Sequence, residues 1–544
     1  MITIFSFLTF YFVLNLIGRG VSRFLGVFNH NYFDIPVILF TPILGLFYIG
    51  NMTVILNFFF PVNSYFQIII LFTPLLFGIS KLKLNINFKR YLNIKTTLIY
   101  FLTPFILGIS SLNTNLAYDA GLYHLNHQNW IKSSKIVFGL SNIHMRFGYS
   151  SIIEYINVNF WLEDNFLLLH FVNLIFIVFF FQVIVTLLFT KYYKFSISIL
   201  IYGFLDNFGF NGGKNGFVEI EAVSKQDTPF AVLFFISTYF LYRYLISKEK
   251  DIDTKLLFYI ILFTTQMRIL GAVCLIAFIL IYLNNNNFFK TLKYFLTTGA
   301  IGSLFGLLFL IKNIITSSCI FFPFDLLCFS SFPWSSKSSY ASASVESGVL
   351  GAFHVAMNTE NYTEWFTKWL SKEVNSVVSK NLFLTICIII IYLFINQKIN
   401  KNRRAPYLFT CTLYVMLSFL IWIFTAPGIR MGIGLFISLI FLISNVYESE
   451  KSINFKNNFG KTILIFYIIV IALVPQVNNY LELVKTPLNL DLVVIESETI
   501  DYVDNELGYG VLPSSGDQCW INLECVRNEN VKKENFYSYV IFKD

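Results

Sequence analysis

One acidic residue, Asp119, lies in the segment 116–125, which reads Leu-Ala-Tyr-Asp-Ala-Gly-Leu-Tyr-His-Leu. This segment follows an apolar run, residues 96–112, that is long enough to cross a membrane. An ionisable carboxylate at the mouth of a membrane helix is unfavourable unless it is solvated or has a function. Because aromatic and histidine residues surround Asp119, we predict chemistry at the boundary between lipid and water.

The residues around Asp119 favour a sugar-binding site. If residues 116–131 form a helix at the membrane surface, the residues that share one of its faces are Asp119, Tyr123, Asn126 and Trp130. His124 and His127 flank this face. Carboxylates supply acid/base chemistry, and aromatic, amide and imidazole groups bind sugar hydroxyls and rings. We therefore predict that Asp119 is catalytic and that Tyr123, His124 and His127 bind substrate.

A simpler interpretation of the same residues stays open. Asp119 would then cap the start of the helix, and the aromatic residues would form a belt at the membrane interface. The spacing of Asp119, His124 and His127 matches no common metal site. No cofactor is therefore predicted, although a divalent metal stays open.

Three cations lie at or near the ends of apolar runs. Arg268 separates two short runs, Lys312 lies near the outer end of its run, and Arg430 follows Ala-Pro-Gly-Ile. A cation at membrane depth needs a counter-ion, and the phosphate of a lipid carrier would serve. We predict that all three bind substrate. The alternative is that they extend to the lipid headgroups. Asp227, before Thr-Pro, fits a helix cap as well as a ligand.

The composition identifies the class of protein. Hydrophobic residues make up 56% of the 544 residues and charged residues 13%, and the mean hydropathy is +0.65. A soluble protein could not bury so much apolar surface, so we expect an all-α polytopic membrane protein. Eleven long apolar runs and three shorter ones predict about 14 transmembrane helices.

Clusters of lysine and arginine predict the orientation. They all fall on one side of the membrane if the N-terminus faces out and the chain crosses 14 times. That side is cytoplasmic by the positive-inside rule. The clusters are Arg19 and Arg23, residues 81–95, Lys191 and Lys194, residues 248–255, Lys290 and Lys293, residues 398–404, and residues 451–461.

The less basic loops therefore face the extracytoplasmic side, and so does any active site. We expect a polytopic domain over residues 1–476 and a small extracytoplasmic region over residues 477–544. The expected location is the bacterial inner (plasma) membrane, with several crossings and both termini outside. The long outer loops are residues 113–164, 206–228 and 316–379.

The cysteines agree with this placement. Cys319 and Cys328 share one outer loop, and Cys519 and Cys525 share the C-terminal region. Each pair could form a small disulfide in an oxidising compartment. The cysteines within membrane runs are more consistent with small apolar fillers; they are Cys274, Cys387 and Cys411.

Four motifs in order resemble those of an uncharacterised family of bacterial polytopic membrane proteins associated with surface-polysaccharide gene clusters. The chain departs from that family at Gly428, where relatives tend to carry an acid, which weakens any role for a second carboxylate there. More distantly, the layout is similar to C-type (GT-C) glycosyltransferases. The motifs are residues 118–124 (Tyr-Asp-Ala-Gly-Leu-Tyr-His), 143–148 (Ile-His-Met-Arg-Phe-Gly), 422–430 (Trp-Ile-Phe-Thr-Ala-Pro-Gly-Ile-Arg), and 516–520 (Gly-Asp-Gln-Cys-Trp) with Cys525.

This resemblance implies a role in building cell-surface glycans. The leading hypothesis is a GT-C-like glycosyltransferase that uses a polyprenyl-phosphate-linked sugar, with Asp119 as the general base for the acceptor hydroxyl. Arg268 and Arg430 would hold the leaving phosphate. The alternatives are a transporter or flippase of a lipid-linked glycan and a polysaccharide polymerase. The expected partners are the lipid bilayer, the polyprenyl-linked sugar and a glycan acceptor, and no nucleic acid.

Overall fold

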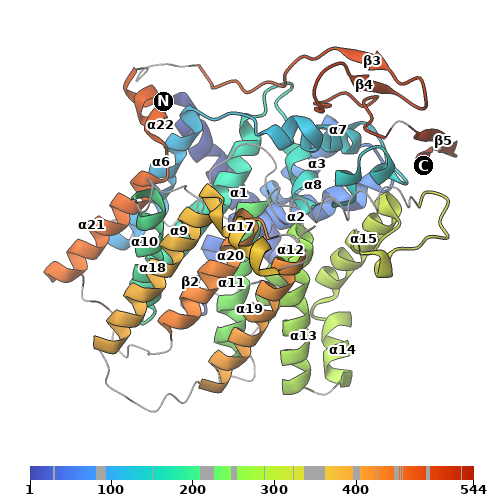
Figure 1. The fold of residues 1–544 in the computed structure, drawn as a ribbon. Helices are drawn as coiled ribbons and strands as arrows, with labels where there is room; N and C mark the ends of the chain where they lie inside the picture. Colours follow the sequence, from blue (N-terminus) through green and yellow to red (C-terminus); the bar gives the residue numbers. More distant parts are fainter. Residues whose placement is uncertain are drawn as a thin grey trace.

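The structure is a computed structural model, and it is mostly helical (Figure 1). The statements below concern the residues that it describes. These are residues 1–27, 31–80, 93–149, 151–208, 226–246, 254–286, 288–322, 324–335, 362–395, 405–425, 427–445, 453, 455, 457–485, 491–528 and 530–543.

Eight helices in these ranges are long and apolar enough to cross a membrane. The central one is α9, whose apolar stretch is buried along its whole length, as expected for a helix that is apolar on every side. The chain is therefore a multi-pass membrane protein. The eight are α1 (Ile2–Phe24), 37–57 with α2 (Thr41–Asn57), 94–112 with α5 (Ile94–Thr97) and α6 (Thr103–Gly108), α9 (Leu167–Leu188), α11 (Asp227–Ile246), α15 (Ala300–Ser317), α18 (Glu373–Ile395) and α19 (Ala405–Thr425).

The described ranges thus hold fewer long spans than the 14 expected. The count becomes nine if α21 (Asn458–Leu473) and α22 (Val477–Lys485), which meet at a bend of 83°, form one span. Several other apolar runs form helices well short of the roughly 20 residues that cross a bilayer perpendicularly. These helices are α3 (Ser64–Ile79), α10 (Tyr193–Phe208), α12 (Lys255–Met267), α13 (Ala272–Asn285) and α20 (Ile429–Ser444). Helix α14 (Phe288–Leu296) contains two lysines and precedes α15.

Several short helices and the C-terminal strands gather at one end of the bundle. Figure 1 shows both termini at this end, with α7 (Leu125–Ser133), α8 (Ile152–Asn157) and the C-terminal strands nearby, while α13 and α14 reach the opposite end. Helix α17 (Tyr362–Ser371) precedes α18.

The all-α expectation needs a correction, because six short segments form three small antiparallel pairs of strands in the described residues. These are β1 (Asn31–Tyr32) with β2 (Ile35–Pro36), β3 (Tyr502–Asp504) with β4 (Val511–Pro513), and β5 (Lys532–Phe536) with β6 (Tyr539–Lys543).

Two helices pack closely enough to place their first residues side by side. A Cβ atom on Gly434 of α20 would lie only 2.8 Å from the Cα atom of Ala231 on α11. Small residues at such contacts let two helix backbones approach each other within a membrane. Because α11 begins at Asp227 and α20 begins at Ile429, this contact brings the starts of both helices together.

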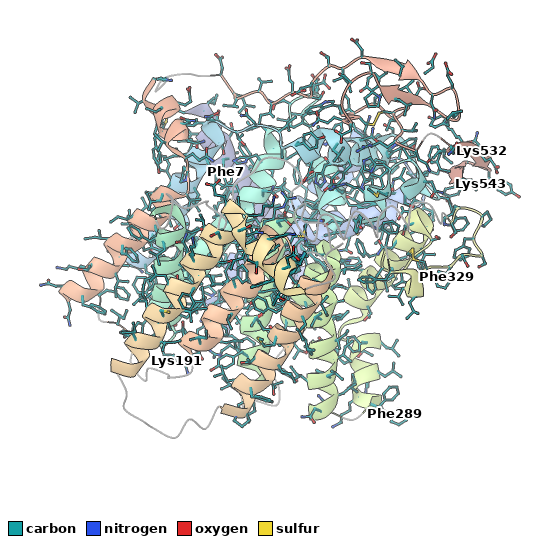
Figure 2. All side chains as sticks on the ribbon, in the orientation of Figure 1. Phe7, Lys191, Phe289, Phe329, Lys532 and Lys543 are labelled. Carbon is teal, nitrogen blue, oxygen red and sulfur yellow. A yellow bond between two sulfur atoms is a disulfide. The ribbon has the colours of Figure 1, made fainter. Side chains whose placement is uncertain are left out.

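The orientation can be tested with two lysine-to-cysteine variants. Lys532 lies at the end that carries the C-terminal strands, and Phe289 at the opposite end (Figure 2). Lys290 follows Phe289 directly. A membrane-impermeant maleimide should label Lys532→Cys in intact cells and Lys290→Cys only after permeabilisation. The parent protein is the background control, since its free cysteines lie in helices. If only Lys290→Cys were labelled in intact cells, the protein would have the opposite orientation.

Candidate functional site

Asp119 lies in the first turn of a helical segment that begins at Tyr118, two residues later than expected, and that turns differently. A π-helical turn spans Ala120–His124, and α7 continues from Leu125. A π turn contains an extra residue compared with an α turn. The side chains that follow are therefore rotated relative to the continuous α-helix predicted over residues 116–131.

This rotation takes Asn126 and Trp130 away from Asp119. The Asn126 side chain donates a hydrogen bond to the carbonyl of Asn522, and the Trp130 ring packs against Phe542 at 5.6 Å between centroids. The single polar face expected from the sequence is therefore wrong for these two residues. They attach the C-terminal region to α7 instead.

The Asp119 carboxylate forms an ion pair instead of a cap. Its side chain makes no capping hydrogen bond to the helix that follows. Its Oδ2 atom lies 3.5 Å from Nη2 of Arg430, and its side chain is 17% exposed. The carboxylate is thus held near water and faces a guanidinium group.

Arg430 is one member of a chain of four alternating charges, which we call the ionic cluster. Its Nε atom lies 3.3 Å from Oδ2 of Asp227. The other oxygen of Asp227, Oδ1, pairs with Nη2 of Arg268. The order is therefore Asp119, Arg430, Asp227 and Arg268. All four side chains keep some exposure to solvent, from 12% to 32%, so water can reach the cluster.

Helix ends position the ionic cluster. Asp227 is the first residue of α11, where the partial positive charge of the helix favours a carboxylate. Arg268 caps the C-terminus of α12 with an extended backbone, where the partial negative charge favours a cation. Gly428 is also extended, so the chain enters α20 with Arg430 in its first turn. Three helix ends therefore meet at one place.

Tyr123 lies beside the ionic cluster. Burial raises the pKa of its phenol, and the negative charge of Asp119 raises it further. The guanidinium of Arg146 lies 5.2 Å from the centre of its ring and acts in the opposite direction. The phenol therefore stays protonated and can donate a hydrogen bond.

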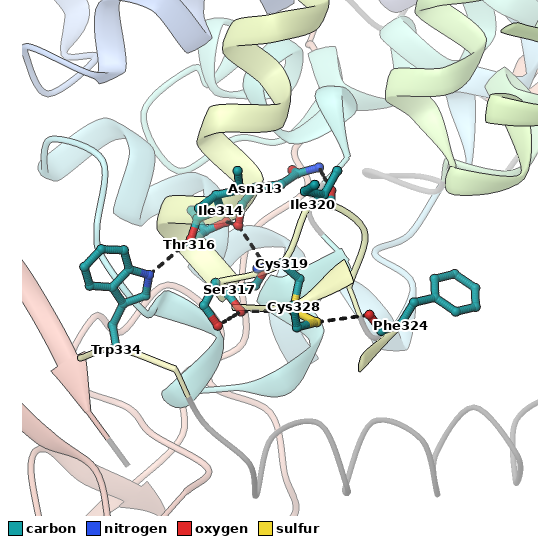
Figure 3. The surroundings of a disulfide bond; sticks show 10 residues. Asn313, Ile314, Thr316, Ser317, Cys319, Ile320, Phe324, Cys328 and Trp334 are labelled. Carbon is teal, nitrogen blue, oxygen red and sulfur yellow. Dashed lines mark hydrogen bonds between the residues drawn. A yellow bond between two sulfur atoms is a disulfide. The ribbon is translucent and has the colours of Figure 1, made fainter. Parts of the chain in front are cut away.

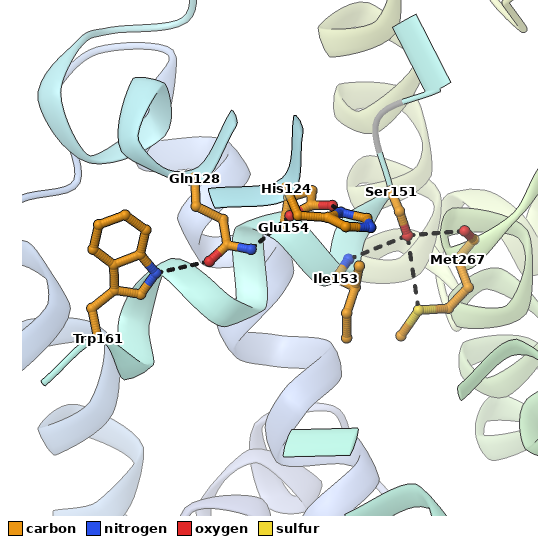
Figure 4. Close-up of polar contacts among 7 residues, drawn as sticks. All are labelled: His124, Gln128, Ser151, Ile153, Glu154, Trp161 and Met267. Carbon is orange, nitrogen blue, oxygen red and sulfur yellow. Dashed lines mark hydrogen bonds and ion pairs between the residues drawn. The ribbon is translucent and has the colours of Figure 1, made fainter. Parts of the chain in front are cut away.

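A buried hydrogen-bond network begins at His124, whose ring centroid lies 4.0 Å from that of Tyr123. Figure 4 shows the residues of this network. Glu154 of α8 accepts from two donors, His124 Nδ1 at 2.5 Å and Gln128 Nε2 at 2.8 Å. Trp161 Nε1 in turn donates to Gln128 Oε1 at 2.8 Å. Because a carboxylate only accepts hydrogen bonds, an ionised Glu154 fixes the proton of His124 on Nδ1.

His127 and Lys312 are also buried, at 1% and 0% exposure. Burial lowers the pKa of His127 well below its usual range, and the positive charge of Lys312 lowers it further. The Lys312 Nζ atom lies 4.2 Å from the centre of the Phe309 ring. The structure thus places His124, His127 and Lys312 in the interior. Among the described residues, no group of three His, Cys, Asp or Glu side chains is arranged to hold a metal ion.

Two acids of this region were not among the predicted site residues. Asp227, which stands directly before Thr-Pro, fits a helix cap as well as it fits a ligand. Glu154 completes the pattern Ser151-Ile-Ile-Glu154, which is typical of a capping box. Ser151 does cap α8, accepting from Ile153 N at 3.3 Å. The signal that could have identified Glu154 is its position as a single acid in the otherwise apolar segment 152–156, which reads Ile-Ile-Glu-Tyr-Ile.

Residues 1–437 match the family described as a domain of unknown function, DUF8201. The chain belongs to the DUF8201 family. This match covers all four members of the ionic cluster and the buried network. No curated protein and no solved structure matches the chain.

A loop outside the DUF8201 match packs on the turn that follows Asp119. The amide nitrogens of Cys519 and Trp520 both donate to the Gly121 carbonyl, at 2.9 and 2.8 Å. A Cβ atom on Gly121 would lie 2.7 Å from the Trp520 ring, so only glycine allows this approach. Cys519 and Cys525 are bonded, as the sequence predicts.

The second predicted pair, Cys319 and Cys328, is also bonded (Figure 3). Its loop follows α15 and is held by Trp334, whose Nε1 donates to the Ile314 carbonyl at 3.1 Å. Disulfides persist in oxidising compartments. Both bonds are therefore consistent with an extracytoplasmic location for this end of the DUF8201 protein.

Proposed function

We propose that this protein is a membrane glycosyltransferase that acts at the extracytoplasmic face. It would transfer sugar from a polyprenyl-phosphate-linked donor during assembly of a cell-surface polysaccharide. The observation that carries this proposal is the ionic cluster. It combines a partly exposed carboxylate with two guanidinium groups where apolar helices end, which is where the phosphate of a lipid carrier would lie.

The two arginines would bind the donor phosphate. Guanidinium groups offer paired N–H donors that match phosphate oxygens. In the free protein, Asp227 forms ion pairs with both Arg268 and Arg430. An arriving phosphate would compete for the same donors, and its contact with Arg430 would free Asp119 from that arginine.

Asp119 would then act as the general base. The acceptor hydroxyl loses its proton to the carboxylate while its oxygen forms the new bond to the anomeric carbon. The bond between that carbon and the phosphate oxygen breaks, and the phosphate leaves with the bonding electrons. Direct displacement of this kind inverts the anomeric centre. The buried network would support the turn that carries Asp119, because His124 belongs to both.

The proposed architecture is GT-C-like, with about 14 crossings when the short helices are counted as tilted or broken spans. Both termini would face the extracytoplasmic side, in the bacterial inner membrane. Two observations support this arrangement. The termini lie at the same end of the bundle (Figure 1), and both disulfides lie in segments predicted to face outward.

A flippase of a lipid-linked glycan is the second candidate. The observation that favours it is the buried pair of His124 and Glu154, since ionisable groups inside membrane proteins often belong to proton pathways. A polymerase of lipid-linked glycans would share the transferase chemistry and differ in its donor.

The deciding experiment gives purified protein a polyprenyl-phosphate-linked sugar in lipid vesicles. A glycosyltransferase should release free polyprenyl phosphate in an amount that depends on added acceptor glycan. A flippase should move the labelled lipid between leaflets and leave it intact. Translocation without release, in protein that binds the lipid, would exclude the transferase. Asp119→Asn is the matched control, because it should abolish release without preventing lipid binding.

A further inference from the structure

An exposed aromatic residue, Tyr118, lies directly before Asp119 and is fixed in place. Its side chain is 60% exposed. Its hydroxyl nevertheless donates to Oδ1 of Asp517 in the C-terminal region, and its carbonyl accepts from Gln518 Nε2 at 2.9 Å. Both the hydroxyl and the backbone of Tyr118 are therefore held, while more than half of the residue remains exposed to water.

The disulfide loop brings a charged pair to this ring. Asp517 lies two residues before Cys519, and Arg527 lies two residues after Cys525. Because the disulfide closes the loop between them, the two flanks meet, and Arg527 Nη1 lies 3.3 Å from Asp517 Oδ2. The Arg527 backbone is also fixed, since its amide donates to the Ile143 carbonyl at 3.0 Å.

This combination of groups is suited to a sugar ring. An aromatic face packs against the C–H face of a sugar, and carboxylate, guanidinium and amide groups at its edge can bind hydroxyls. A residue that is already ordered loses little conformational entropy when the ligand binds. The hydrogen bond to Asp517 raises the pKa of Tyr118, and Asp119 adds to that effect. The phenol therefore keeps its proton.

We propose that Tyr118, Asp517 and Arg527 form a sugar subsite that presents the acceptor glycan to Asp119. The identity of the sugar as acceptor rests on the proposed function, whereas sugar binding itself does not. Asp517 and Arg527 lie outside the DUF8201 match, which ends at residue 437. Recognition of the acceptor is thus divided between the family region, which supplies Tyr118 and Asp119, and the C-terminal region.

Saturation-transfer NMR on the full-length protein in lipid nanodiscs tests the subsite. The probes are the methyl glycosides of a neutral hexose, an N-acetylhexosamine and a hexuronic acid. At least one should receive saturation from the wild type, and Tyr118→Ala should weaken its binding by roughly tenfold. Tyr537→Ala is the matched control, because Tyr537 is an exposed tyrosine between β5 and β6 and should not matter.

Tyr118→Phe separates sugar binding from a purely structural role. It keeps the aromatic face and loses the hydrogen bond to Asp517, so most of the binding should remain. If Tyr118 only docks the C-terminal region, phenylalanine should behave like alanine, and the proposal is wrong. It is also wrong if no probe binds the wild type, or if Tyr118→Ala and Tyr537→Ala have equal effects. Asp119→Asn should still bind the probe but lose glycosyl transfer. Normal glycosyl transfer by Asp119→Asn would count against the general base and leave the subsite proposal intact.

Discussion

Replacing Asp119 with asparagine should lower glycan formation by roughly 10²-fold or more, which is the range typical of general-base loss. Asparagine keeps the size of the side chain and most of its hydrogen bonding, but it cannot accept the proton of the acceptor hydroxyl. The measurement is the amount of surface glycan made in cells, or polyprenyl phosphate released in vitro, at equal protein level.

The level of folded protein should not change, which separates this effect from misfolding. The pair of Asp119 and Arg430 is long, at 3.5 Å, and both side chains are partly exposed. Such pairs contribute about 0–1 kcal/mol to stability. Arg430→Lys is the complementary variant: it keeps the charge and loses the paired donors, so donor binding should weaken more than turnover. Normal glycan assembly by Asp119→Asn would show that the carboxylate is not the base.

Replacing Glu154 with alanine should destabilise the protein by about 3 kcal/mol, which is typical of removing one partner from a buried polar pair. The change leaves His124 Nδ1 and Gln128 Nε2 without their acceptor in the interior. Thermal unfolding of the purified protein, followed by fluorescence-detected size exclusion, should show a lower Tm.

Two further variants test the cause of that loss. Glu154→Gln keeps one acceptor oxygen and should lower the Tm less than alanine does. Glu364→Ala removes the same type of side chain from α17, where the ion pair between Glu364 and Lys368 is about half exposed. Its effect on stability should stay below about 1 kcal/mol. Equal Tm values for Glu154→Ala and Glu364→Ala would contradict a structural role for the buried network.

Part of the ionic cluster can be predicted from the sequence, because the signal for each of those residues is local. A charge beside an apolar run needs a reason, and this rule selects Asp119, Arg268 and Arg430 one at a time. It cannot pair them, since Asp119 and Arg430 are 311 residues apart in the chain and meet only in the folded protein. Asp227 is not selected in this way, because its position before Thr-Pro fits the cap of a helix as well as it fits a ligand.

The helix boundaries were harder to predict than the class of protein. Hydropathy identifies apolar segments, but it does not show that α12 ends at Met267 and that Arg268 follows in extended form. The π turn after Asp119 was equally hidden, because a single extra residue leaves the composition of Ala120–His124 unchanged. The extra residue of the π turn rotates the side chains that follow it, and Asn126 and Trp130 therefore lie away from Asp119.

The contact between Tyr118 and Asp517 also constrains when the site can exist during synthesis. The two residues are 399 positions apart, and ribosomes add roughly 5–20 residues per second. The turn that carries Asp119 is therefore made about 20 to 80 s before its partner loop. In the proposed orientation, that loop must then cross the membrane and be oxidised before it can dock. A nascent chain would already contain Asp119 of the ionic cluster, yet the Tyr118 ring of the proposed subsite would not be ordered until this late step.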